Sequence, residues 1–151
     1  MRGCATWLVA LLFAASVAVH SGEPSPATVQ VQDAWIRWLP GNVPAAGYVT
    51  LVNDTDVTFI LTGVSSVDYG SVSLHQSRQQ GGVSSMAPVS AITIKPHSTL
   101  VFGNEGYHLM LMEPKKTLKP GDMARIDLHF SNGMLIGPLF QLRSPDMLMS
   151  R

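Results

Sequence analysis

Short runs of alternating apolar and polar residues, divided by closely spaced turn signals, constrain the fold of this chain most strongly. The run RIDLHF at residues 125–130, for example, alternates as a half-buried strand does. Turn sequences such as NDTD, GG and KPGD stand between such runs, and long patterns of helical period are absent. We therefore expect a single all-β domain of eight to ten short strands, the last of them over residues 134–142, arranged as a β-sandwich or small barrel.

The charge balance excludes one class of partner. The formal net charge is zero, and charged residues make up 13% of the 151 residues. No stripe of Lys or Arg is present, so we expect no nucleic-acid partner. A chain of this length can bury a core as one domain, and a monomer is expected.

The N-terminal residues have the layout of a secretory signal peptide. A positive charge at Arg2 precedes the apolar run WLVALLFAASVAV, and small residues follow it. The run is short for a membrane span, although a retained anchor is the alternative. We expect a signal peptide at residues 1–22, one domain at 23–143 without a membrane span, and a short flexible tail at 144–151.

Cleavage of such a signal peptide would remove Cys4, the only cysteine in the chain. The mature domain would then have neither a thiol nor a disulfide. Any site for a soft metal ion would have to use Met and His side chains. Thioethers oxidise less readily than thiols, so this choice suits an exported protein.

A metal site of this kind is indicated between residues 74 and 112. Tyr107-His108-Leu109-Met110-Leu111 alternates as a strand, so an imidazole and a thioether would share one face and the two leucines the other. Thioether sulfur favours a soft monovalent ion, and imidazole suits copper. Our main hypothesis is a Cu(I) site made of four residues, namely His75, Met86, His108 and Met110.

Structural roles are the alternative for these residue types. A Met on a strand is commonly core filler, and a His is commonly solvated or hydrogen-bonded. From spacing alone, the four-residue site and these structural roles both stay open. We assign structural or solvated roles to the remaining candidates of the domain, with Met112 and Met134 as core filler, and Met147 and Met149 in the tail stay open as metal ligands. The remaining candidates are His97, Met112, Met123, His129 and Met134.

The long spacings resemble those of the PCuAC family of periplasmic copper chaperones. That family carries a His, ten residues, a Met, twenty-one residues and then His-x-Met, and His75, Met86, His108 and Met110 match this in type and spacing. Segments such as DAWIR, AAGY, MAPV and LKPGD also resemble family segments. The resemblance extends over roughly residues 29–142.

The resemblance implies a cupredoxin-like, Ig-like β-sandwich or barrel without electron-transfer copper. It also implies a non-enzymatic Cu(I) metallochaperone of the periplasm that transfers copper by ligand exchange. The acceptor would be the CuA centre of cytochrome c oxidase or a Sco-type protein, so a role in cytochrome c oxidase assembly is expected.

Two other functions are compatible with the sequence. One is a secreted Ig-like binding module in which His and Met are structural. The other is a copper-storage or copper-tolerance protein without a delivery role. An enzyme is disfavoured because no Ser-His-acid group or carboxylate pair stands out.

Overall fold

The computed structural model describes residues 27–146, and the expected signal peptide lies outside them. The described chain is almost entirely β-structure. Its strands are β1 (Gln30–Arg37), β2 (Ala45–Asn53), β3 (Phe59–Ser66), β4 (Tyr69–Gln80), β5 (Val83–Pro88), β6 (Ile92–Ile94), β7 (Ser98–Val101), β8 (Tyr107–Pro114), β9 (Met123–Phe130), β10 (Leu135–Ile136) and β11 (Leu139–Arg143). Between residues 27 and 146, no helix is long and apolar enough to cross a membrane.

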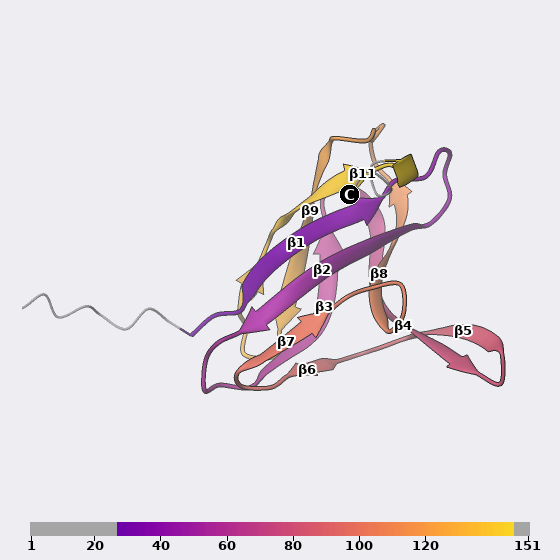
Figure 1. Ribbon diagram of the computed structural model, residues 1–151. Helices are drawn as coiled ribbons and strands as arrows, with labels where there is room; N and C mark the ends of the chain where they lie inside the picture. The colour runs from indigo at the N-terminus through magenta and orange to yellow at the C-terminus, as the bar shows by residue number, and fades with distance from the viewer. Residues whose placement is uncertain (1–26, 147–151) are drawn as a thin grey trace, which may run out of the picture.

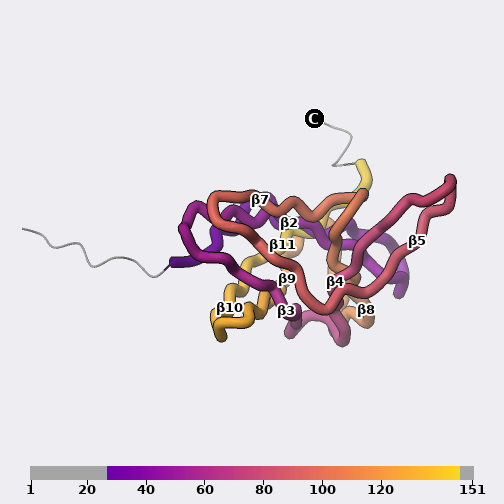
Figure 2. The backbone as a smooth tube through the Cα atoms, turned by 90° about the horizontal axis from the view of Figure 1, so that it is seen from below, coloured from indigo at the N-terminus to yellow at the C-terminus, as the bar shows by residue number. Residues whose placement is uncertain are grey.

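The strands form one continuous sheet that curls around a single core. Its order is β5-β4-β8-β2-β1-β11-β9-β3-β6, with β10 paired to β9 and β7 paired to β2. Figures 1 and 2 show β2 and β7 on one side of the core and β3, β4 and β8 on the other. The all-β sandwich or barrel predicted from the sequence is therefore confirmed.

Aliphatic side chains from both sides of the sheet fill the core. Alternation places Leu109 and Leu111 of β8 and every second residue of β9 in it, because successive side chains of a strand point to opposite faces. The fully buried residues include Ile36, Leu51, Leu61, Leu109, Leu111, Ile126, Leu128 and Phe140. Burial of a Leu or Ile side chain contributes about 1.5–3 kcal/mol, so this cluster is the main source of stability.

Gly47 allows β2 to approach β8 closely. It pairs with Leu109, and a Cβ atom built at this glycine would lie 3.1 Å from the Leu109 Cβ atom. Such a contact is tighter than ordinary van der Waals packing. The close approach holds the N-terminal half of β2 against β8, which in turn pairs with β4.

The sequence prediction of one last strand over residues 134–142 is wrong. The structure has two strands there, β10 and β11, both paired with β9. Gly137 and Pro138 separate them. Pro138 has no backbone N–H to donate to the sheet, which accounts for the interruption.

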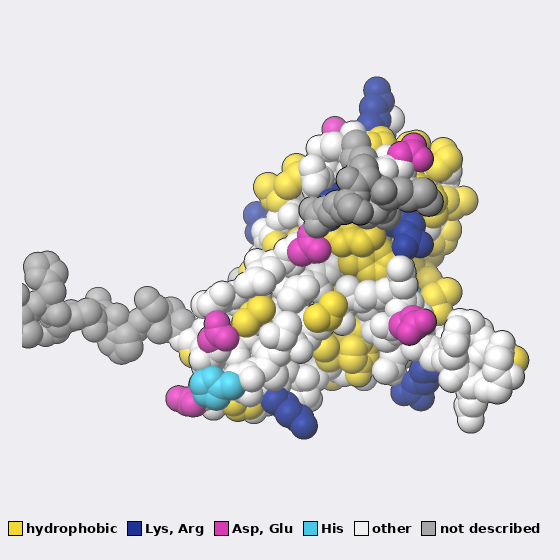
Figure 3. Space-filling model, in the orientation of Figure 1, with side chains coloured by type: hydrophobic (Ala, Val, Ile, Leu, Met, Phe, Trp, Pro, Cys, Tyr) yellow, Lys and Arg dark blue, Asp and Glu magenta, His cyan; other side chains and the backbone are white. Residues whose placement is uncertain are grey.

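A β-hairpin made of the end of β4 and all of β5 projects from the body of the molecule (Figures 1 and 2). β5 pairs only with β4, and all six of its residues are exposed. Gly81 and Gly82 form the turn with φ angles of 59° and 79°, in the left-handed region that favours glycine. Figure 3 shows the hairpin as a lobe of mostly uncharged polar surface.

Candidate metal centre

The two histidines of the sequence hypothesis face each other across the β4–β8 pair. His75 lies directly opposite His108 in the antiparallel register. Their ring centroids are 5.9 Å apart, and the rings are tilted by 41°. Cross-strand neighbours lie close enough for both side chains to contact one small ligand.

Alternation along β8 separates the candidate ligands from the core side chains, as predicted from the sequence. Leu109 and Leu111 are fully buried in the core. His108 and Met110 therefore share the opposite face of the strand. Met110 lies opposite Ser73 of β4 and Ala46 of β2.

His108 is more deeply buried than a residue on the outer face of a sheet usually is. Its exposed fraction is only 6%. Burial lowers the pKa of His108, and the neighbouring His75 lowers it further, while a hydrogen bond with the Gly106 backbone acts in the opposite direction. The neutral imidazole, which has a lone pair for a metal ion, is thereby favoured.

His75 contains an unsatisfied polar atom. Its Nδ1 is buried and has no hydrogen-bond partner among the described residues. A buried polar atom without a partner costs about 1–3 kcal/mol, so such atoms are uncommon unless a ligand or water satisfies them. An ion bound between the two rings would satisfy this nitrogen.

The two methionines lie at one cavity with His108. The cavity has a volume of about 260 Å³ and is lined by Pro44, Ala45, Ala46, Met86, His108, Leu109 and Met110. Met86 comes from the projecting hairpin and is 60% exposed. His75 is not part of the lining but lies beside His108.

The donor set of this region is soft and uncharged. Within residues 27–146, no group of three or more His, Cys, Asp or Glu side chains could hold a metal ion. Sites for hard cations need oxygen ligands, and zinc sites use Cys, His or carboxylates. Two imidazoles and two thioethers instead match Cu(I), which tolerates trigonal or tetrahedral geometry.

The other histidines of the domain lie away from this cavity and have their own partners. The His97 Nε2 lies 2.7 Å from the Asp56 Oδ1, and the His129 Nε2 lies 2.7 Å from the Ser65 Oγ. Both side chains are exposed, as expected from the sequence for residues that are not metal ligands.

Two of the remaining methionines differ in their burial. Met134 packs against the core, as expected. The expectation that Met112 fills the core is wrong, because this side chain is 37% exposed on the face that carries Met110. Met147 and Met149 lie outside the described residues.

One wall of the cavity could not be found from the sequence. Ala45 and Ala46 belong to a strand that is distant in sequence, and only the β2–β8 register brings Ala46 opposite Met110. Their small side chains leave room beside the imidazole and the thioether. No local motif signals this role.

A protein-family model matches most of the described domain. Residues 29–136 match the model of the LpqE-like family, described as putative lipoprotein LpqE-like. The putative lipoprotein Lxx21020 of Leifsonia xyli subsp. xyli (strain CTCB07) is 32% identical over 106 residues. That match spans 70% of this chain but only 63% of the length of the relative.

Solved structures share the fold. The copper-bound PCuAC domain from PmoF2 matches with a TM-score of 0.64 and 25% identity, over 78% of this chain and 93% of that domain. The solution structure of CuI-DR1885 from Deinococcus radiodurans matches with a TM-score of 0.61 and 26% identity, over 82% of this chain and 83% of that protein. The recognition of a PCuAC-like fold from sequence spacing is thus confirmed.

Proposed function

This chain belongs to the LpqE-like family, and we propose that it is an exported Cu(I)-binding metallochaperone. The observation that carries the proposal is the unsatisfied His75 Nδ1 beside the His108 ring, on the face that also bears Met110. Two similar structures, the PCuAC domain from PmoF2 and DR1885, contain bound copper, which in DR1885 is Cu(I). The proposed ligands are His75, Met86, His108 and Met110.

The proposed ligand set suits a monovalent ion. All four donors are neutral, so the bound ion would keep a net charge of +1, which costs less to bury than a divalent ion. The d¹⁰ configuration imposes no preferred geometry. A ligand set drawn from β4, β5 and β8 could therefore close around the ion without strain in the sheet.

Transfer would proceed by ligand exchange. Met86 is the most exposed of the four ligands, and an acceptor's Cys or Met could replace its sulfur at the ion. No general acid, base or nucleophile is needed, so the proposed function is not enzymatic. The proposed acceptor is the CuA centre of cytochrome c oxidase, reached directly or through a Sco-type protein.

The proposed location is the periplasm, reached through a signal peptide at residues 1–22. The family of putative lipoproteins and the N-terminal sequence both support export. In this location a site without thiols would resist oxidation. The domain at 23–143 and the tail at 144–151 stay predictions, as does the monomeric state.

A Cu(I) titration against a Cu(I)-selective competitor under reductant tests the site. We expect one equivalent to bind, and we expect binding to be lost in the Met86→Ala/Met110→Ala double variant. The matched control is Met112→Ala/Met123→Ala, which removes two exposed thioethers outside the cavity and should titrate like the parent chain. Equal titration of the parent chain and the Met86/Met110 variant would refute the site.

A secreted Ig-like binding module remains the second candidate, because the same β-sandwich serves in many binding domains. A ligand that binds only the native state raises the melting temperature. A melting curve that is identical with and without Cu(I) under reductant would favour the binding module. A storage or tolerance role is distinguished by mixing the loaded protein with a reduced CuA domain, since storage predicts no transfer.

A further inference from the structure

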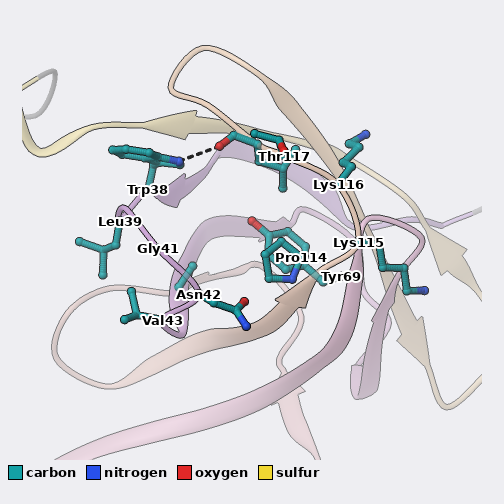
Figure 4. Close-up of a pocket in the computed structure, with 12 residues that line it drawn as sticks. Trp38, Leu39, Gly41, Asn42, Val43, Tyr69, Pro114, Lys115, Lys116 and Thr117 are labelled. Carbon is teal, nitrogen blue, oxygen red and sulfur yellow. Dashed lines mark hydrogen bonds between the residues drawn. The ribbon is translucent and has the colours of Figure 1, made fainter.

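A second cavity of this domain is separate from the histidine pair. Its volume is about 520 Å³, within the range of small-molecule sites. It lies between the β1–β2 connection and the β8–β9 connection (Figure 4). Tyr69 and Pro114, which are paired, lie six residues along β4 and β8 from His75 and His108. The linings of the two cavities share only Ala45.

Trp38 gives this cavity a flat apolar wall. Its indole Nε1 donates a hydrogen bond of 2.8 Å to the Leu118 carbonyl oxygen, which ties the two connections together and fixes the ring (Figure 4). Leu39 and Val43 continue the wall although they are 37% and 50% exposed. Adjoining exposed apolar side chains beside a fixed indole can pack against the aromatic or aliphatic part of a ligand.

Tyr69 supplies a polar group inside the cavity. The residue is only 5% exposed, and its hydroxyl makes no hydrogen bond to any residue between 27 and 146. Burial, and secondarily the charge of Asp68, raise the pKa of Tyr69 to about 12. The hydroxyl therefore stays protonated at neutral pH and can donate a hydrogen bond to a ligand oxygen.

The charged side chains of the lining are both cations. Lys115 and Lys116 lie at the rim, and no Asp or Glu belongs to the lining. The Lys116 Nζ is paired with the Asp68 Oδ1 at 2.6 Å, whereas Lys115 makes no ion pair within the described part of the chain. In Figure 4 the Lys115 side chain points away from Trp38 and Val43, and rotation about its flexible stem would bring its ammonium group to an anion at the rim.

We propose that this cavity binds a carboxylic acid that carries an aromatic ring. The ring packs against Trp38, Leu39 and Val43, and the carboxylate accepts hydrogen bonds from the Tyr69 hydroxyl and the Lys115 ammonium group. The chemistry is shared by two sources, a free aromatic acid and the C-terminal aromatic residue of a polypeptide. This site is independent of the copper proposal because none of the four proposed copper ligands lines it.

The test is a titration of the ¹⁵N-labelled protein, followed through the Trp38 indole N–H signal. The probes are 3-phenylpropionate and the peptide Ala-Ala-Phe, with 3-phenylpropionamide and acetate as controls that lack the charge or the ring. We expect saturable shifts of Trp38 with at least one of the two carboxylate probes and much weaker effects with both controls. The tighter probe identifies the source.

Two variants link the titration to the proposed contacts. Tyr69→Phe keeps the ring and removes the hydroxyl, and Lys115→Ala removes the unpaired cation; each should weaken binding about fivefold or more. Lys95→Ala, outside the cavity lining, is the matched control and should bind like the parent chain. Both binding variants should retain the Cu(I) affinity of the parent, which keeps failure of this site distinct from failure of the copper site.

The proposal is overturned if neither carboxylate probe shifts the Trp38 signal saturably. It is also overturned if the amide binds as tightly as the acid. Unchanged affinity in both Tyr69→Phe and Lys115→Ala would likewise refute it. A melting curve of each variant confirms that the fold is retained.

Discussion

The strands that bear the two proposed thioether ligands, β8 and β5, both pair with β4 but differ in their burial and in their place in the sheet. β8 lies between β4 and β2, and alternate residues of it are fully buried in the core. β5 is an edge strand on a projecting hairpin, and each of its residues is exposed. The proposed ligand set thus combines three side chains from the paired strands β4 and β8 with one side chain from the projecting hairpin.

The proposed metal carrier must both fix the geometry of its site and give access to it, and different strands would meet these two requirements. His75, His108 and Met110 are positioned by the β4–β8 ladder, whose geometry the core maintains. Met86 depends on a hairpin that has few contacts with the rest of the domain, and such segments open at low free-energy cost. The sheet would define the geometry of the site, and the hairpin would control access to it.

The largest expected effect comes from the core side of β8. Leu109→Ala should lower the free energy of unfolding by about 3 kcal/mol, because it leaves a cavity under the proposed site. Val83→Ala on the hairpin should change it by less than about 0.5 kcal/mol. Urea denaturation of both variants measures the two values. A similar loss in both would mean that the hairpin is as important to stability as the sheet.

A smaller effect is expected at alkaline pH from Tyr69, at the start of β4. The pKa of this residue is raised to about 12, whereas an unfolded Tyr titrates near pH 10. Above pH 10 the native state therefore binds more protons than the unfolded state, so stability falls as pH rises. The loss from this group should reach about 1.4 kcal/mol at pH 11.

Urea denaturation at pH 9 and pH 11 measures this loss. Tyr48 also has a raised pKa, so the parent chain must be compared with Tyr69→Phe, which lacks only the Tyr69 contribution. The variant should lose less stability than the parent between the two pH values. An identical loss would show that the Tyr69 hydroxyl is solvated in the native state.

The two thioether side chains are also expected to differ in their contribution to stability. Met110→Ala should destabilise the fold by about 1–2 kcal/mol because Met110 is half-buried on the sheet. Met86→Ala should leave stability within about 0.5 kcal/mol of the parent, since Met86 is exposed. Both variants should nevertheless lose Cu(I) affinity in a competitor titration. Unchanged affinity in Met86→Ala would remove the hairpin from the ligand set.

Local patterns allowed much of the fold to be predicted. Period-2 alternation in residues 107–111 correctly separated Leu109 and Leu111 from His108 and Met110, because the pleat of a strand enforces that separation. Turn residues such as Gly81 and Gly82 marked the hairpin. The break at Pro138 was missed, since the surrounding apolar residues continue the strand pattern on both sides.

Properties that depend on pairing between distant segments could not be predicted. The burial of His108 and the unsatisfied nitrogen of His75 follow from the β4–β8 and β2–β8 registers. The exposure of Met112 and the cavity at Tyr69 also depend on distant segments. The cavity, for example, is formed by the β1–β2 and β8–β9 connections. Spacing in the sequence identifies candidate ligands, but the sheet register determines their environment.

The arrangement of the hairpin has a consequence for how such a protein can diversify. Substitutions and insertions near Gly81 and Gly82 would alter the outline presented to a partner while the folded body keeps its stability. Substitutions at Gly47 or Leu109 would disturb the packing under the histidines instead. In the proposed carrier, the surface offered to a partner could therefore vary at the Gly81–Gly82 turn without a change in His75, His108 or Met110.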